Sequence, residues 1–125
     1  MGDIVKKLEI QGDKGKADGT VLFDTGASRS LVRRDFVAKI ATLHRSPYPY
    51  TFRLGDGKGR LKVDEFVALF IKLKGMTIFH QFLVAKNLAE EMVLGSDAMQ
   101  LWKIELVPEK EDVRVRKELI DLKLV

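Results

Sequence analysis

The chain has 125 residues and no cysteine, which excludes disulfides and thiolate-ligated metal sites. Its 46% of hydrophobic residues is typical of a globular protein, and its length predicts one domain over residues 1–125. The net charge of +4 is mild and no block of basic residues dominates, so a solvated charged surface is favoured over a nucleic-acid-binding one.

Signals for membranes, secretion and zinc are weak in this sequence. No apolar run reaches the roughly 18 residues of a membrane span. The N-terminal stretch MGDIVKKLEI lacks the apolar segment of a secretory signal, so we expect a cytoplasmic protein without membrane association. The two histidines, His44 and His80, stand alone in the sequence, and a histidine-based metal site is therefore not expected.

The first part of the chain predicts two strands and a helix. Leu8 and Ile10 alternate with polar neighbours and indicate a first strand, followed by a turn at residues 13–19. Residues 20–23 form a second predicted strand. Apolar residues at helical spacing predict a short helix within residues 33–43.

The middle of the chain predicts two hairpins. Prolines make residues 46–50 an extended connector, and alternating apolar residues then flank a glycine-rich turn at residues 55–59. The nearly continuous apolar run at residues 66–73 predicts a strand buried on both faces, with a bulge at residues 64–65. Residues 76–84 are its expected hairpin partner.

The last part of the chain predicts a short buried strand at residues 92–94. Asp97, with Gln100 three residues later, resembles a capping box that opens a helix at residues 98–102. Residues 104–107 and 113–115 predict a hairpin, and residues 119–125 a final strand.

One motif carries recognisable chemistry. The sequence Asp24-Thr25-Gly26-Ala27-Ser28 follows an apolar strand and resembles the catalytic signature of aspartic proteases, in their single-domain, retropepsin-like branch. A glycine-rich hairpin follows about thirty residues later, where that family has its flap, and Val93-Leu94-Gly95 resembles the family's second glycine element. The resemblance implies an all-β, retropepsin-like acid-protease fold with a flap hairpin and one or two short helices.

The resemblance also implies a mechanism. Peptide hydrolysis needs an activated water and a proton for the leaving nitrogen, and in aspartic proteases two carboxylates that share one proton supply both. The sequence contains one Asp-Thr-Gly, so a pair requires a symmetric homodimer with Asp24 and its mate at the axis. Thr25 would hydrogen-bond across that axis. Gly26 would allow close approach and conformations closed to other residues.

Further residues are expected to bind an extended peptide or protein substrate. They come from the catalytic loop, the flap and the second glycine element: Ala27, Ser28, Leu54, Gly55, Asp56, Gly57, Val93, Leu94 and Gly95. No metal or organic cofactor is implied. Retroviral enzymes commonly carry a paired Asp and Arg where this chain has Ser28 and Ser96, which favours a cellular or microbial member of the family.

Other interpretations stay open. Asp24 could cap a turn, although this does not explain the apolar strand before it. The glycine-rich turn at residues 55–59 could be an exposed hairpin without a role; a phosphate-binding loop is disfavoured because it needs a following helix. We expect an aspartic endopeptidase. The alternatives are a catalytically silent, dimeric peptide-binding module on the same fold and, less favoured, a basic β-barrel that binds nucleic acid.

Overall fold

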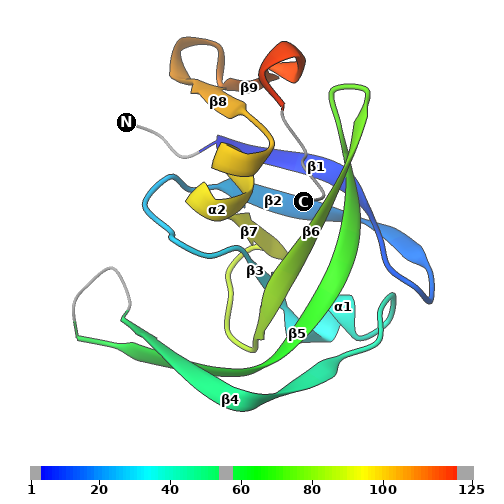
Figure 1. Ribbon diagram of the computed structural model, residues 1–125, viewed down its shortest axis with the longest axis vertical. Helices are drawn as coiled ribbons and strands as arrows, with labels where there is room; N and C mark the ends of the chain where they lie inside the picture. The colour runs from blue at the N-terminus through cyan, green and yellow to red at the C-terminus, as the bar shows by residue number, and fades with distance from the viewer. Residues whose placement is uncertain (1–3, 54–57, 121–125) are drawn as a thin grey trace.

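The computed structural model describes residues 4–53 and 58–120, and these form a β-barrel with short helices (Figure 1). Seven strands pair in the order β1-β2-β7-β3-β6-β5-β4, and an additional β1–β5 pairing closes the first six into a barrel. The strands are β1 (Ile4–Gln11), β2 (Lys16–Phe23), β3 (Leu31–Arg33), β4 (His44–Arg53), β5 (Arg60–Leu73), β6 (Met76–Ala85) and β7 (Met92–Leu94).

Strand β5 buries one face only, and this corrects the prediction for residues 66–73. Along β5, Val67, Leu69 and Ile71 point into the core, whereas Phe70 between them is 44% exposed. Phe70 packs against Phe79 of β6 on the outside of the barrel, with 5.1 Å between ring centroids and the rings tilted by 48°. The prediction of two buried faces was wrong because no helical layer covers this antiparallel part of the sheet.

The predicted helix and turn of the first part are shorter than expected. Only α1 (Arg34–Val37) is helical within residues 33–43, because Arg33 still belongs to β3, which pairs in parallel with β6. The predicted turn at residues 13–19 is also too long, since β2 already begins at Lys16 and pairs with β1.

Both predicted hairpins of the middle part are present in the described residues. The β4–β5 register moves from Arg45 opposite Glu65 to Tyr50 opposite Val63, so the predicted irregularity exists, but the extra residues lie on β4. They include two prolines, which an edge strand tolerates because its outer N–H groups need no partner. The β5–β6 turn has positive φ at Lys74 and Gly75, as tight hairpin turns require.

The C-terminal part packs on the barrel as α2 (Ser96–Leu101) and the hairpin of β8 (Ile104–Val107) and β9 (Asp112–Val115), with the 3₁₀ turns η1 (Pro108–Lys110) and η2 (Lys117–Leu119). The predicted strand at residues 119–125 was wrong at Leu119, which lies in η2, and residues 121–125 are outside the described part.

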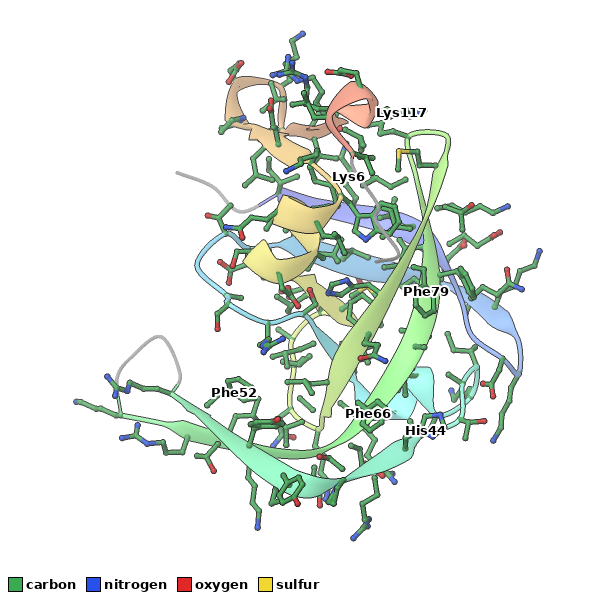
Figure 2. The ribbon with its side chains drawn as sticks, viewed as in Figure 1. Lys6, His44, Phe52, Phe66, Phe79 and Lys117 are labelled. Atoms are coloured by element: carbon green, nitrogen blue, oxygen red, sulfur yellow. The ribbon has the colours of Figure 1, made fainter. Side chains whose placement is uncertain are left out.

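One carboxylate fastens this C-terminal hairpin to the barrel. Asp112 accepts hydrogen bonds from Lys6 and Lys74, each at 2.8 Å, and Lys6 lies on β1 facing the hairpin (Figure 2). These two lysines hold the pKa of Asp112 well below its ordinary value. The ion pairs join β9 to β1 and to the β5–β6 turn. Within residues 4–53 and 58–120, no helix has the length and apolarity needed to cross a membrane.

Candidate active site

Asp24 stands where two parallel strands end side by side. β2 and β7 pair in parallel with Phe23 opposite Leu94, and the Asp24 N–H donates to the Leu94 carbonyl at 2.9 Å. The Gly26 N–H donates to Asp24 Oδ1 at 2.9 Å. The buried strand thus fixes the backbone of Asp24, and the Gly26 N–H holds the carboxylate oxygen Oδ1. Within residues 4–53 and 58–120, no protein group hydrogen-bonds the second oxygen, Oδ2.

One predicted property of the residues that follow Asp24 is not found. Thr25 and Gly26 are exposed, and Gly26 has no positive φ, so the expected unusual backbone conformation is absent. Glycine at this position instead leaves room for the carboxylate, because a Cβ would lie 3.3 Å from Asp24 Oδ1. Cross-axis contacts of Thr25 and Gly26 stay predictions.

The catalytic loop, residues 24–30, crosses closely over Gly95. A Cβ at Gly95 would lie 2.6 Å from the Ala27 carbonyl oxygen and 2.8 Å from that of Arg29. The Ala27 carbonyl also accepts the Ser96 N–H at 2.7 Å, and the Ala27 N–H donates to the Asp24 carbonyl. Both backbone groups of Ala27 are therefore already bonded within the chain.

Beneath this loop lies a hydrogen-bonded cluster that the sequence did not reveal, formed by Ser30, His80 and Asp97. Ser30 Oγ donates to Asp97 Oδ1 at 2.7 Å, and the Ser30 N–H donates to Oδ2 at 3.2 Å. His80 Nε2 lies 3.0 Å from the same Oδ2, and the Gly95 N–H donates to Ser30 Oγ at 3.0 Å. The cluster therefore links the catalytic loop, the second glycine element and β6.

The predicted capping role of Asp97 was wrong. The N-cap of α2 is Gly95, without a side-chain cap, and the Asp97 carboxylate points to Ser30 and His80. Burial raises the pKa of Asp97, but the hydrogen bonds from His80 and Ser30 together outweigh it and hold the pKa below its ordinary value. Because the carboxylate lies between the serine and the histidine, the three do not form a nucleophilic triad, in which the histidine must contact the serine.

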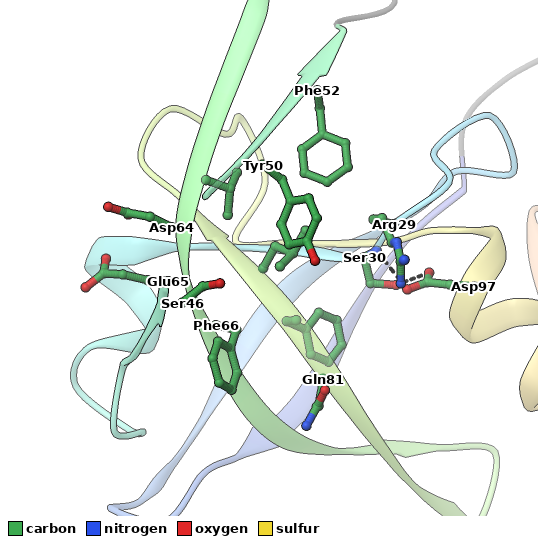
Figure 3. A pocket seen from close by; sticks show the side chains of 13 residues that line it. Arg29, Ser30, Ser46, Tyr50, Phe52, Asp64, Glu65, Phe66, Gln81 and Asp97 are labelled. Carbon is green, nitrogen blue, oxygen red and sulfur yellow. Dashed lines mark hydrogen bonds between the residues drawn. The ribbon is translucent and has the colours of Figure 1, made fainter. Parts of the chain in front are cut away.

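A pocket of about 330 Å³ lies between the catalytic loop and the β4–β5 hairpin (Figure 3). The rings of Tyr50 and Phe52 on the hairpin, together with Phe66 at its base, form one side, and Arg29 and Ser30 form the other. A largely aromatic wall suits the bulky apolar side chains of an extended peptide. Asp24 does not line this pocket, whose carboxylates are those of Asp64, Glu65 and Asp97.

The remaining predicted substrate-binding residues fall into three groups. Ala27 and Ser28 lie on the catalytic loop, with Ser28 exposed. Val93 and Leu94 are 8% and 0% exposed and Gly95 is buried, so in this single chain they support the loop from below. The four hairpin residues lie outside the described part: Leu54, Gly55, Asp56 and Gly57. Substrate contact by all of these residues stays a prediction.

Sequence patterns could not have found the cluster or the pocket wall. Ser30 precedes Asp97 by 67 residues and His80 precedes it by 17, and the three together form no sequence motif. Tyr50 and Phe52 were recognised only as strand residues. Within residues 4–53 and 58–120, no three His, Asp or Glu side chains converge as metal ligands.

Gly95→Ala tests the close crossing of the loop. The added Cβ would collide with backbone oxygens that cannot move without displacing the loop, so we expect the free energy of unfolding to fall by about 1–3 kcal/mol. Urea denaturation measures this. Gly15→Ala is the matched control, since a Cβ there meets nothing within 4 Å and its φ is not positive. Equal stability of the two variants would contradict the proposed crowding.

Asp97→Asn tests the cluster. An amide cannot accept all the bonds that the carboxylate receives, and Ser30 is 1% exposed, so we expect a loss of about 1–3 kcal/mol in unfolding free energy at neutral pH. Because the pKa of Asp97 is lowered in the folded chain, the wild-type advantage is complete above the ordinary Asp pKa. It disappears as the pH falls through the folded value. Asp35→Asn, which removes only an exposed pair with Arg33, should change stability little. A wild-type advantage that persists in strong acid would contradict this account.

Comparisons with known proteins agree with this geometry. The family model described as aspartyl protease matches residues 7–98. The EIAV protease complexed with the inhibitor HBY-793 is 24% identical, with a TM-score of 0.60, over 85% of this chain and 93% of that one. The retroviral protease-like domain of Ddi1 from Leishmania major is 14% identical, with a TM-score of 0.62, over 90% of this chain and 88% of that one.

No match was found among curated proteins. At such identities the two solved structures show the fold, which is retropepsin-like, while the family model spans well over half of the chain. The chain therefore belongs to the aspartyl protease family, with the retropepsin-like fold of its single-domain members.

Proposed function

We propose that this chain is an aspartic endopeptidase that acts as a symmetric homodimer, with Asp24 and the partner subunit's Asp24 forming the catalytic pair. The observation that carries the proposal is the placement of Asp24. It stands at the end of a buried strand, on a loop whose Thr25 and Gly26 are exposed, in a chain of the aspartyl protease family. The sequence holds one such motif, so the second carboxylate must come from a second copy.

The chemistry follows from two adjacent carboxyl groups that hold one proton. The ionised carboxylate removes a proton from a water, whose oxygen attacks the carbonyl carbon of the peptide bond. The protonated partner donates its proton to the carbonyl oxygen. The carbon–nitrogen bond then breaks as a proton passes to the amine, and a carboxylic acid and an amine are released. The Gly26 N–H occupies Asp24 Oδ1, which leaves Oδ2 as the oxygen for this exchange.

A surface beside Thr25 supports docking of a second copy. A shallow hollow of about 390 Å³ opens there, bordered by Met99, Ile104 and Leu119. Leu119 is 49% exposed and Leu101 on α2 is 45% exposed. Apolar side chains next to an exposed catalytic loop are what an interface around the axis would cover.

The substrate we propose is an extended polypeptide that lies between the catalytic loop and the β4–β5 hairpin. The 330 Å³ pocket, with the rings of Tyr50 and Phe52, would receive one of its apolar side chains. An extended peptide satisfies its backbone groups by pairing with exposed main chain, so it would be bound largely through its backbone.

The first prediction concerns assembly. Equilibrium sedimentation should show a species of twice 14.2 kDa at micromolar concentration. Leu119→Glu should shift it to monomer and remove activity, because a charge would enter the proposed interface. Phe79→Glu changes a side chain of similar exposure, 46%, on the outside of the barrel and should leave the dimer intact. Full activity in a purely monomeric sample would refute the shared pair.

The second prediction concerns Asp24. Asp24→Asn should abolish cleavage of a denatured protein substrate, because the amide cannot remove a proton from water. The variant should fold and dimerise, since its side-chain oxygen can still accept the Gly26 N–H. Asp18→Asn, at an exposed position of β2, is the control and should cleave normally. Wild-type activity should decline at alkaline pH as the pair loses its shared proton.

The outcomes separate the alternatives. A wild-type dimer that binds peptides but cleaves none at acid pH would favour the silent peptide-binding module. An active Asp24→Asn variant would show that another group is the catalyst.

A further inference from the structure

The outer face of the β4–β5 hairpin gathers cations that the linear sequence separates. Antiparallel register places Arg53 directly opposite Arg60, and Thr51 opposite Lys62. Register partners share a face of the sheet, and so do pairs two residues apart, so all four side chains project to the same side. We call the exposed Arg53, Arg60 and Lys62 the basic hairpin face.

These three charges have no acidic partner among residues 4–53 and 58–120. The salt bridges among these described residues join other cations, and the Arg60 guanidinium donates to the Gly59 carbonyl. Two arginines directly opposite each other destabilise a hairpin. A folded hairpin that tolerates this arrangement is complementary to an anionic partner.

The side chains of the opposite hairpin face restrict the nature of that partner. The intervening pairs are Tyr50 with Val63 and Phe52 with Leu61, on the other face of the hairpin. Tyr50, Phe52 and Val63 line the pocket, and the rings of Tyr50 and Phe52 lie 6.3 Å apart (Figure 3). The basic hairpin face therefore has no aromatic ring among its members. Single-stranded nucleic acid depends on aromatic platforms for base stacking, so charge alone would have to hold it.

The edge of the hairpin favours a polypeptide instead. Among residues 4–53 and 58–120, β4 is the last strand of the sheet and pairs with β5 alone. Its prolines, Pro47 and Pro49, precede the segment that carries Thr51 and Arg53, so the last four residues of the strand retain their N–H groups. An extended chain can add to such an edge through main-chain hydrogen bonds.

We propose that the basic hairpin face and the adjacent free edge of β4 bind an extended acidic polypeptide segment with Asp or Glu at alternate positions. In an added strand, every second side chain lies on the same face, about 7 Å apart. Carboxylates at alternate positions therefore all lie on the side of Arg53, Arg60 and Lys62. Binding does not depend on Asp24. Under the proposed function, the segment would belong to the substrate, outside the stretch that is cleaved.

Fluorescence anisotropy with labelled peptides tests the proposal. The probe alternates Glu and Thr; a second peptide has the same composition with the Glu residues in one block, and a third replaces Glu by Gln. We expect the alternating peptide to bind best, the block peptide about tenfold more weakly and the Gln peptide not measurably, with affinity falling as salt rises. Repeating the titration with the Asp24→Asn variant excludes cleavage of the peptide. Binding by this variant tests the hairpin site whether or not the chain is an aspartic endopeptidase.

Matched variants locate the site. Arg53→Gln, Arg60→Gln and Lys62→Gln together should weaken binding of the alternating peptide at least about tenfold. Lys14→Gln, Lys16→Gln and Lys110→Gln remove the same charge from exposed positions outside the hairpin and should leave binding unchanged. Unaltered binding in the hairpin variant, equal binding of the block peptide, or tighter binding of oligothymidylate than of the alternating peptide would each overturn the proposal.

Discussion

The missing side chain at Gly95 is the constraint on which the catalytic loop depends. The backbone oxygens of Ala27 and Arg29 occupy the space where a Cβ would stand. This close crossing brings Ser30 within reach of the Gly95 N–H, and Asp97, two residues further along, can then receive both the hydroxyl and the N–H of Ser30. The buried Ser30 hydroxyl both donates and accepts a hydrogen bond, so the loop is held by buried groups. These bonds, together with the bond from the Asp24 N–H to the Leu94 carbonyl, fix the position of Asp24.

The two faces of the β4–β5 hairpin carry different kinds of side chain. Tyr50, Phe52 and Val63 on its inner face line the pocket, and the outer pairs, Thr51 with Lys62 and Arg53 with Arg60, are polar or cationic. Alternation along a strand makes such a division possible with very few residues. One hairpin can therefore contact a polypeptide in the pocket and another segment along its outer edge.

Local sequence patterns were sufficient to predict most of the strands and to find the Asp-Thr-Gly motif at residues 24–26. Asp24 was recognised because a charged residue directly follows an apolar strand and precedes glycine. Properties that depend on distant partners were not accessible. The run at residues 66–73 looked buried on both faces, because apolar content does not tell whether another layer covers a sheet. The position of Asp97 before Gln100 fitted a helix-capping pattern, but its carboxylate forms hydrogen bonds with the distant Ser30 and His80. The predicted helix was cut short because Arg33 belongs to β3 and because the residues after Val37 turn to meet residues 13–14, where the Ile40 carbonyl accepts the Lys14 N–H and the Thr42 N–H donates to Asp13.

The parallel pairing of β2 with β7 has a consequence for the order of folding. The β5–β6 hairpin joins neighbours in the chain, from Leu73 opposite Met76 outward, whereas Val21 meets Met92 across most of the sequence. Contacts between distant residues form late, because the intervening chain must be ordered first. The Leu94 carbonyl and Gly95, which hold the Asp24 loop, are among these distant partners. Until the chain has been synthesised as far as Gly95, the loop that carries Asp24 lacks the backbone groups that fix it.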